Sequence, residues 1–232
     1  MDQIESLQVN EHGFLDVTAL KLIAVVSMLI DHIGYVFFPS VKLLRIIGRL
    51  AMPIYCFCVS EGLIHTRSRK AYLLRVSIFA LISELPYDMA FNGRFEFKDQ
   101  NVMFTFIFAI LGIDIGEFIL EKNRSSAAQF FALIASLLFA ALAQVIHTDY
   151  GIFGVVLVYM FYFFRSLPVF RILVSALFVT VTCWGKRELY CLPAFILLML
   201  YNGQRGAGFK YLFYSFYPVH LAVLALLDRF MF

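Results

Sequence analysis

Long apolar runs, separated only by short polar connections, constrain the fold of this chain more than any other feature of its sequence. A helix needs about 20 apolar residues to cross the hydrocarbon of a bilayer. The sequence offers nine apolar segments, of which the sixth and the eighth are short. They lie at about 17–38, 43–64, 71–91, 102–120, 127–146, 151–164, 169–184, 189–201 and 209–230. The runs lack barrel-like alternation, so we predict that each is a helix.

Composition supports the same fold class. Hydrophobic residues make up 62% of the chain and charged residues 15%, against roughly 25% charged residues in soluble domains. We therefore predict an all-α fold, a polytopic transmembrane helical bundle surrounded by membrane lipid. Residues 1–16 would form a polar N-terminal segment and 17–232 a single integral membrane domain. The net charge of +3 is too small to indicate a nucleic-acid partner.

The cysteines do not predict a metal site. No pair has the spacing of a zinc motif with matching histidines, so we expect no metal and interpret the thiols as small buried hydrophobes. The four residues are Cys56, Cys58, Cys183 and Cys191.

The most basic connection sets the predicted orientation. Arg67, Arg69 and Lys70 follow the second apolar segment, and positively charged connections favour the cytoplasm. We therefore predict a multi-pass protein of the inner or plasma membrane, with a cytoplasmic N-terminus and the C-terminus outside. The cluster is typical of a topology signal. It could also hold the phosphates of a cytosolic cofactor, with Arg75 and Arg205 nearby.

Asp31 and His32 lie side by side in the outer third of the first segment. Ionisable groups at that depth are costly and usually mark function. Neighbouring helical side chains point about 100° apart, so each of the two needs a partner from elsewhere. His32 could act as a general base or as a transient acyl carrier. The alternative is a packing pair in which Asp31 neutralises Arg45 or Arg49.

Other polar residues fall at the same predicted depth. Arg45 and Arg49 share a helix face and could steady an oxyanion or hold a carboxylate, unless they simply pair with acids of the third segment. Pro86 in that segment is expected to break the regular helix. The remaining polar candidates in this layer are Glu84, Asp88, Asn101, Tyr217 and His220.

Six stretches, in this order across nearly the whole chain, resemble the TraX family. They are Met28-Leu29-Ile30-Asp31-His32-Ile33-Gly34, Arg45-Ile46-Ile47-Gly48-Arg49-Leu50-Ala51-Met52-Pro53, Ser83-Glu84-Leu85-Pro86-Tyr87-Asp88, Asn101-Val102-Met103-Phe104-Thr105, Asp149-Tyr150-Gly151-Ile152-Phe153-Gly154 and Phe216-Tyr217-Pro218-Val219-His220-Leu221. The family is named for acetylation of the N-terminus of conjugative pilin. The resemblance implies an inner-membrane acetyltransferase that uses cytosolic acetyl-CoA.

The function predicted from these features is O- or N-acetyl transfer to an acceptor at the outer side of the membrane. The acceptor would be a pilin N-terminus or another envelope substrate such as a glycan. We assign catalytic roles to His32, Asp31, His220 and Arg49, and Asp31 would fix an imidazole tautomer. Substrate binding is assigned to Arg45, Glu84, Asp88, Asn101 and Tyr217, and cofactor binding to Arg67, Arg69, Lys70 and Arg75. A proton-coupled transporter and a membrane assembly protein without catalysis are the alternatives, because membrane carboxylates and histidines also form proton relays.

Overall fold

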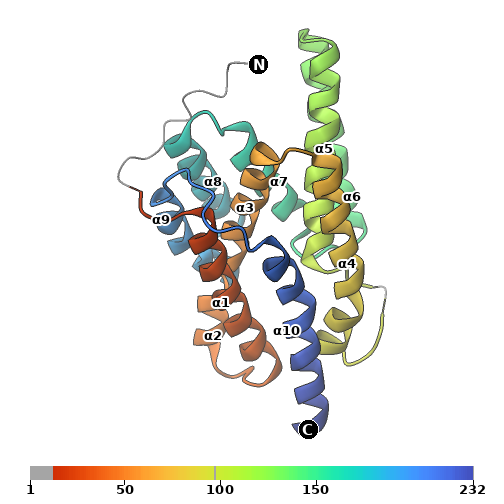
Figure 1. Cartoon of the computed structure of the whole chain (residues 1–232), viewed down its shortest axis with the longest axis vertical. Helices are drawn as coiled ribbons and strands as arrows, with labels where there is room; N and C mark the ends of the chain where they lie inside the picture. The colour runs from red at the N-terminus through yellow and green to blue at the C-terminus, as the bar shows by residue number, and fades with distance from the viewer. Residues whose placement is uncertain (1–12, 97, 232) are drawn as a thin grey trace.

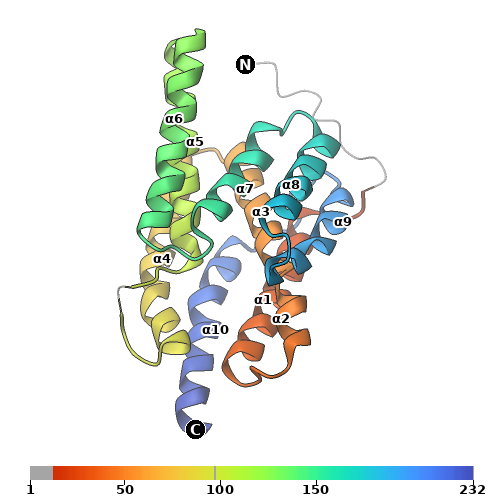
Figure 2. The same cartoon turned by 180° about the vertical axis from the view of Figure 1, so that it is seen from behind.

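The computed structural model describes residues 13–96 and 98–231, and these residues form a bundle of helices (Figures 1 and 2). In chain order the helices are α1 (Val17–Val36), α2 (Lys42–Gly48), α3 (Ala51–His65), α4 (Arg69–Phe91), α5 (Val102–Lys122), α6 (Ser126–Val145), α7 (Gly151–Phe163), α8 (Pro168–Thr182), the 3-10 helix η1 (Arg187–Cys191), α9 (Pro193–Met199) and α10 (Lys210–Met231). The predicted all-α class is therefore confirmed for the described residues. Most of the predicted polar segment 1–16 lies outside them.

Polar side chains fix where several helices begin. Asp16 accepts a hydrogen bond from the backbone N–H of Ala19 and so caps α1. Ser68, Asn101 and Ser125 cap α4, α5 and α6 in the same way. A capping oxygen satisfies one of the free N–H groups at a helix start, which would otherwise be costly near lipid. The polar connections in the sequence therefore mark helix starts directly.

Five segments are long and apolar enough to cross a membrane. They are Val17–Val36, Lys42–His65, Val102–Lys122, Ser126–Val145 and Lys210–Phe230. The described part of the chain therefore belongs to a helical membrane protein, with fewer full-length apolar spans than the nine predicted. The remaining helices are too short or too polar to meet this criterion. α7 and α8 have only 13 and 15 residues, α9 has seven, and α4 carries several charged residues.

α4 and α5 run in opposite directions, whereas α1 and α10 run in the same direction. The start of α4 contacts the end of α5, because Arg69 pairs with Asp114 at 2.9 Å and with Glu117 at 2.6 Å. The hairpin of α5 and α6 projects beyond the other helices at one end, and α10 with the C-terminus projects at the other (Figure 1). Gly112 lets α5, α6 and α7 pack closely, because a Cβ there would meet the hydroxyl of Tyr159, which donates to the carbonyl of Ser136 at 2.9 Å.

Pro86 does not break its helix, and that prediction was wrong. α4 continues from Arg69 to Phe91 through Pro86, and α10 runs through Pro218 in the same way. Proline removes one backbone donor from each helix, but membrane helices tolerate this where neighbouring groups compensate. The four cysteines are free and buried, as expected.

Candidate functional site

Two histidines from opposite ends of the chain form a hydrogen-bonded pair inside the bundle. His32 lies in the last third of α1 and His220 midway along α10. Nδ1 of His32 is 2.8 Å from Nε2 of His220, and the two rings are within 8° of parallel. Tyr217 packs beside His220 and is itself buried. The structure thus brings together three residues that the sequence singled out separately.

The hydrogen bonds of this pair fix which nitrogens carry protons when both rings are neutral. Nδ1 of His220 lies 2.8 Å from the carbonyl oxygen of Phe216, which can only accept, so this nitrogen donates. Nε2 of His220 must then accept from the Nδ1–H of His32. The remaining nitrogen, Nε2 of His32, keeps its lone pair and has no hydrogen-bond partner among the residues described. The pair therefore presents one basic nitrogen.

Asp31 is bound by arginines rather than by an imidazole. Nη1 of Arg45 donates to its Oδ2 at 2.6 Å, and Nη1 of Arg49 approaches its Oδ1 at 3.4 Å. The expected role of Asp31, fixing an imidazole tautomer, is therefore filled by His220 and the Phe216 carbonyl. Asp31 instead balances two positive charges next to the histidines, which is the alternative considered for it from the sequence.

Gly48 allows the arginines to reach Asp31. It lies between Arg45 and Arg49, and a Cβ added there would come within 2.1 Å of the Cβ of Asp31. Only a glycine lets the end of α2 approach α1 so closely. The sequence stretch from Arg45 to Arg49 therefore combines two guanidinium groups with the space they need.

We expect Gly48→Ala to destabilise the protein by about 1–3 kcal/mol, because the added methyl group overpacks a tight contact. The midpoint of thermal unfolding in detergent measures this effect. Gly208→Ala is the matched control, since a Cβ at that position meets nothing within 4 Å. Equal midpoints for the two variants would contradict the close packing of α1 and α2.

A cavity of about 830 Å³ opens beside the histidine pair. Its size lies in the range of small-molecule sites, which is about 300–1,000 Å³. We call it the histidine cavity. Its wall includes Asp31, His32, Tyr35, Arg45, Arg49, Tyr87, Phe91, Asp99, Asp149, Tyr150, Phe153, Phe178, Lys186 and Glu188. This mixture of charged and aromatic side chains suits a polar acceptor that also offers flat or apolar surface.

The turn between α6 and α7 adds an acid that the predicted site did not include. Asp149 lines the histidine cavity, and the hydroxyl of Thr105 donates to its backbone carbonyl. Burial raises the pKa of Asp149 to about 6, while the nearby guanidinium of Arg49 opposes this shift. Tyr150 follows in a left-handed conformation, with φ of 66°. The Asp149-Tyr150-Gly151 stretch is recognisable in the sequence, but only the fold places it against Arg49.

Four of the five predicted substrate-binding residues do not line this cavity. Tyr217 lines two smaller cavities instead. The side-chain amide of Asn101 donates to the carbonyl of Ala80 at 2.9 Å and also to Glu84. Asp88 accepts from the backbone N–H of Glu96 at 2.9 Å. These contacts join α4 to the chain around the start of α5. Their geometry indicates structural roles for Glu84, Asp88 and Asn101, and in the described part of the chain neither acid pairs with the arginines beside Gly48.

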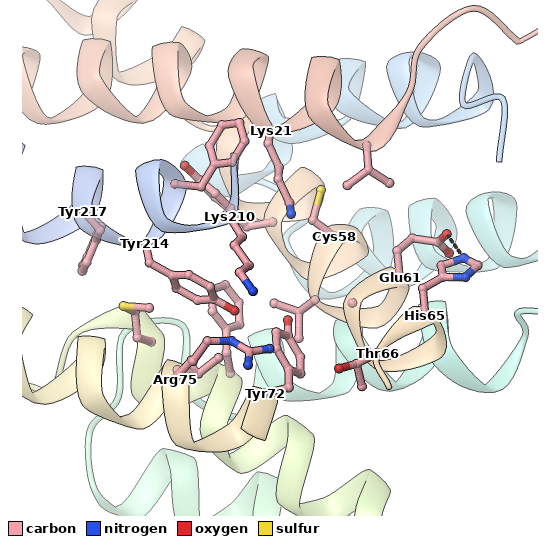
Figure 3. Close-up of a pocket in the computed structure, with 18 of the residues that line it drawn as sticks. Lys21, Cys58, Glu61, His65, Thr66, Tyr72, Arg75, Lys210, Tyr214 and Tyr217 are labelled. Atoms are coloured by element: carbon pink, nitrogen blue, oxygen red, sulfur yellow. Dashed lines mark ion pairs between the residues drawn. The ribbon is translucent and has the colours of Figure 1, made fainter. Parts of the chain in front are cut away.

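The predicted cofactor-binding cluster is divided by the fold. Arg69 is bound to Asp114 and Glu117, and Arg67 and Lys70 are exposed at the start of α4. Arg75, one turn further on, lines a separate cavity of about 190 Å³. That cavity is also lined by Lys21 and Lys210 (Figure 3) and by Arg205, and we call it the basic pocket. Sequence reasoning missed its lysines because they start or interrupt apolar segments far apart in the chain.

These features define an integral helical membrane protein with a buried histidine pair beside a polar cavity. The family model described as TraX protein matches residues 16–228. The chain belongs to the TraX family, which confirms the resemblance seen in the sequence.

Two relatives are similar over different shares of the chain. "Probable fimbrial assembly protein FimC, serogroup H1" of Dichelobacter nodosus is 32% identical over 234 residues, covering 88% of this chain and 92% of the relative. "Uncharacterized protein RP591" of Rickettsia prowazekii (strain Madrid E) is 30% identical over 122 residues, covering 53% of this chain and 42% of the relative. No solved structure gives a significant match.

Proposed function

We propose that this protein transfers an acetyl group from acetyl-CoA to an amine or hydroxyl acceptor held in the histidine cavity. The observation that carries this proposal is the pair of His32 and His220, which leaves Nε2 of His32 unprotonated. The cavity beside the pair supplies room for an acceptor. Membership of the TraX family supports the reaction class, because the family is named for pilin acetylation.

In the direct mechanism His32 acts as the general base. Its Nε2 takes the proton of the acceptor as the acceptor nitrogen or oxygen forms a bond to the acetyl carbon. The carbon–sulfur bond then breaks, and His32 returns the proton to the leaving thiolate, so atoms and charge balance. In the two-step variant Nε2 attacks the acetyl carbon, the carbon–sulfur bond breaks and CoA leaves as its thiolate. The acceptor then attacks the acetyl carbon, the bond to Nε2 breaks, and the acceptor proton neutralises the thiolate. His220 positions His32 in both cases by accepting its Nδ1–H.

Arg49 is placed to stabilise the negative charge that develops on the acetyl oxygen. Its ion pair with Asp31 is 3.4 Å long, against 2.6 Å for Arg45, and its Nε is buried without a partner among the described residues. Arg49 therefore keeps donor capacity that Arg45 has already used. Preorganised donors of this kind are among the largest contributions to catalysis of acyl transfer.

We place the histidine cavity at the outer side of an inner membrane. Arg67 and Lys70 lie at the opposite end of α4 from Phe91, which lines this cavity, and basic connections favour the cytoplasm. The name of the Dichelobacter relative refers to fimbrial assembly. This supports a pilin as the acceptor, and an envelope glycan is the other acceptor class that we consider.

A proton-coupled transporter is the second candidate, because the histidine pair also has the geometry of a short proton relay. Purified protein incubated with acetyl-CoA labelled in the acetyl group separates the two. We expect thiol release together with label on the acceptor or on the protein. Solute or proton flux in vesicles, without thiol release or label, would instead favour the transporter.

A further inference from the structure

We infer that the basic pocket, formed by Lys21, Arg75, Arg205 and Lys210, binds the phosphate groups of the acyl donor. This inference rests on the proposed function and names the donor site for it. It moves the predicted site from Arg67 and Lys70 to the basic pocket. Three observations lead to it. In the described chain the four cations have no carboxylate partner, the one acid that lines the pocket is bound by other residues, and a small cavity lies between this pocket and His32.

The four cations of the basic pocket come from three separate parts of the chain and share one space. Lys21 is on α1, Arg75 on α4, and Arg205 and Lys210 lie before or at the start of α10. In Figure 3 the ammonium groups of Lys21 and Lys210 and the guanidinium of Arg75 point into the same space. The Thr18 hydroxyl holds the Arg205 segment against α1 through the carbonyl of Ala207, at 2.8 Å.

No carboxylate of the described chain neutralises these cations. Among residues 13–96 and 98–231, none of the four forms an ion pair, and Nε of Arg75 is buried without a hydrogen-bond partner. Glu61 lines the pocket, but Arg171 and Tyr201 bind its two oxygens at 2.8 Å each. Like charges gathered in a concave site, without an internal counterion, favour a multiply charged anion.

A small cavity of about 40 Å³ lies between the basic pocket and the histidine cavity. It shares Asp31, His32, Asp149 and Tyr150 with the histidine cavity and Met28, Tyr55, Val102, Phe106 and Tyr217 with the basic pocket. The shared residues on the side of the basic pocket are mostly apolar or aromatic. This small cavity therefore suits a narrow, largely uncharged part of a ligand rather than a phosphate group.

The geometry defines the class of ligand. Lys21 and His32 lie on the same helix, and eleven residues separate them along the chain, which corresponds to about 16 Å at the helical rise. A ligand that uses both sites needs phosphates at one end, a slender arm of about that length and a reactive group at the other end. An acyl thioester carried on a phosphorylated nucleotide through a linear arm has this form.

The test measures binding of free CoA to purified protein in detergent that contains no phospholipid. The triple variant K21Q/R75Q/K210Q removes charge from the basic pocket, and R67Q/K70Q removes exposed charge near the same end of the chain. We expect the Kd for CoA to rise at least about tenfold in the triple variant, because charge-assisted contacts are strong. It should stay within about twofold of the original in the control, as is usual for surface changes. Unchanged unfolding midpoints show that both variants are folded.

Two results would overturn the inference. One is a triple variant that binds CoA as the original protein does. The other is a pocket that takes lipid phosphate instead: the original protein would not bind CoA, and phosphatidylglycerol would raise its unfolding midpoint but not that of the triple variant.

The proposed reaction has a separate readout. CoA binding that depends on the pocket, without acetyl transfer, would contradict only the function. Transfer with an unchanged KM for acetyl-CoA in the triple variant would contradict only the donor site.

Discussion

Replacing His32 with alanine is expected to lower acetyl transfer by about 10²–10⁴-fold, which is the usual cost of losing a general base. The physical reason is the bonding of the histidine pair. The Nδ1–H of His32 donates to His220 at 2.8 Å, so Nε2 holds the lone pair that would take the proton of the acceptor. Release of CoA thiol in the presence of an acceptor measures the rate. Binding of CoA should change little, because the basic pocket does not contain His32.

Two further variants show whether His32 acts as a base or only positions a group, and whether loss of any histidine would have the same effect. In His32→Gln the amide can still donate to His220 but cannot take a proton or carry an acetyl group at neutral pH, so transfer should stay low. Near-normal transfer by His32→Gln would show that His32 only positions a group, and the catalytic role would pass to His220. His147→Asn is the matched control, since His147 is exposed in a turn with φ of 57°, a conformation that asparagine tolerates.

Replacing Glu61 with alanine is expected to destabilise the protein by about 3–5 kcal/mol, because it leaves a buried guanidinium without its counterion. Arg171 is only 5% exposed and pairs with Glu61 at 2.8 Å. Tyr201 donates to the other oxygen of Glu61, so this single carboxylate joins α3 to α8 and to the segment after α9. The free energy of unfolding in mixed detergent micelles measures the loss.

A double variant tests whether the unpaired charge causes this loss. In E61L/R171M both charges are replaced by apolar groups, and such replacements are often neutral or stabilising. We therefore expect most of the lost stability to return. Glu121→Ala is the control for loss of a glutamate, since Glu121 is exposed at the end of α5. A double variant as unstable as Glu61→Ala would show that the hydrogen bond from Tyr201 matters more than the ion pair.

The apolar segments of the sequence predicted most of the helices, but 43–64 is divided into α2 and α3, and 189–201 into η1 and α9. Each segment must satisfy its own backbone hydrogen bonds in lipid, so a long apolar run has few alternatives to a helix. The capping residues Asp16, Ser68 and Ser125 stand at the polar connections where helices begin. The cost of ionisable groups in a membrane likewise makes His32 and His220 conspicuous in the sequence alone.

Span lengths and the path of α4 were predicted less well. Hydropathy recognises an apolar run, but it does not show whether a helix of 13 residues, such as α7, reaches across the bilayer. Pro86 was expected to break the regular helix, yet α4 continues through it. Whether a proline interrupts a membrane helix depends on the neighbouring groups that compensate for its missing donor, and these come from other helices.

The partners of each polar side chain were decided only by the tertiary structure. Asp31 contacts Arg45 and Arg49, and His32 contacts His220 across 188 positions of sequence separation. Helical periodicity shows which residues share a face but not which faces meet. For the same reason the basic pocket could not be found in the sequence, because Lys21 and Lys210 meet only when α1 and α10 pack together. The sequence determined by itself that costly polar groups lie inside a helical membrane protein. Helix packing determined which of them form the histidine pair, which neutralise each other and which stay unpaired.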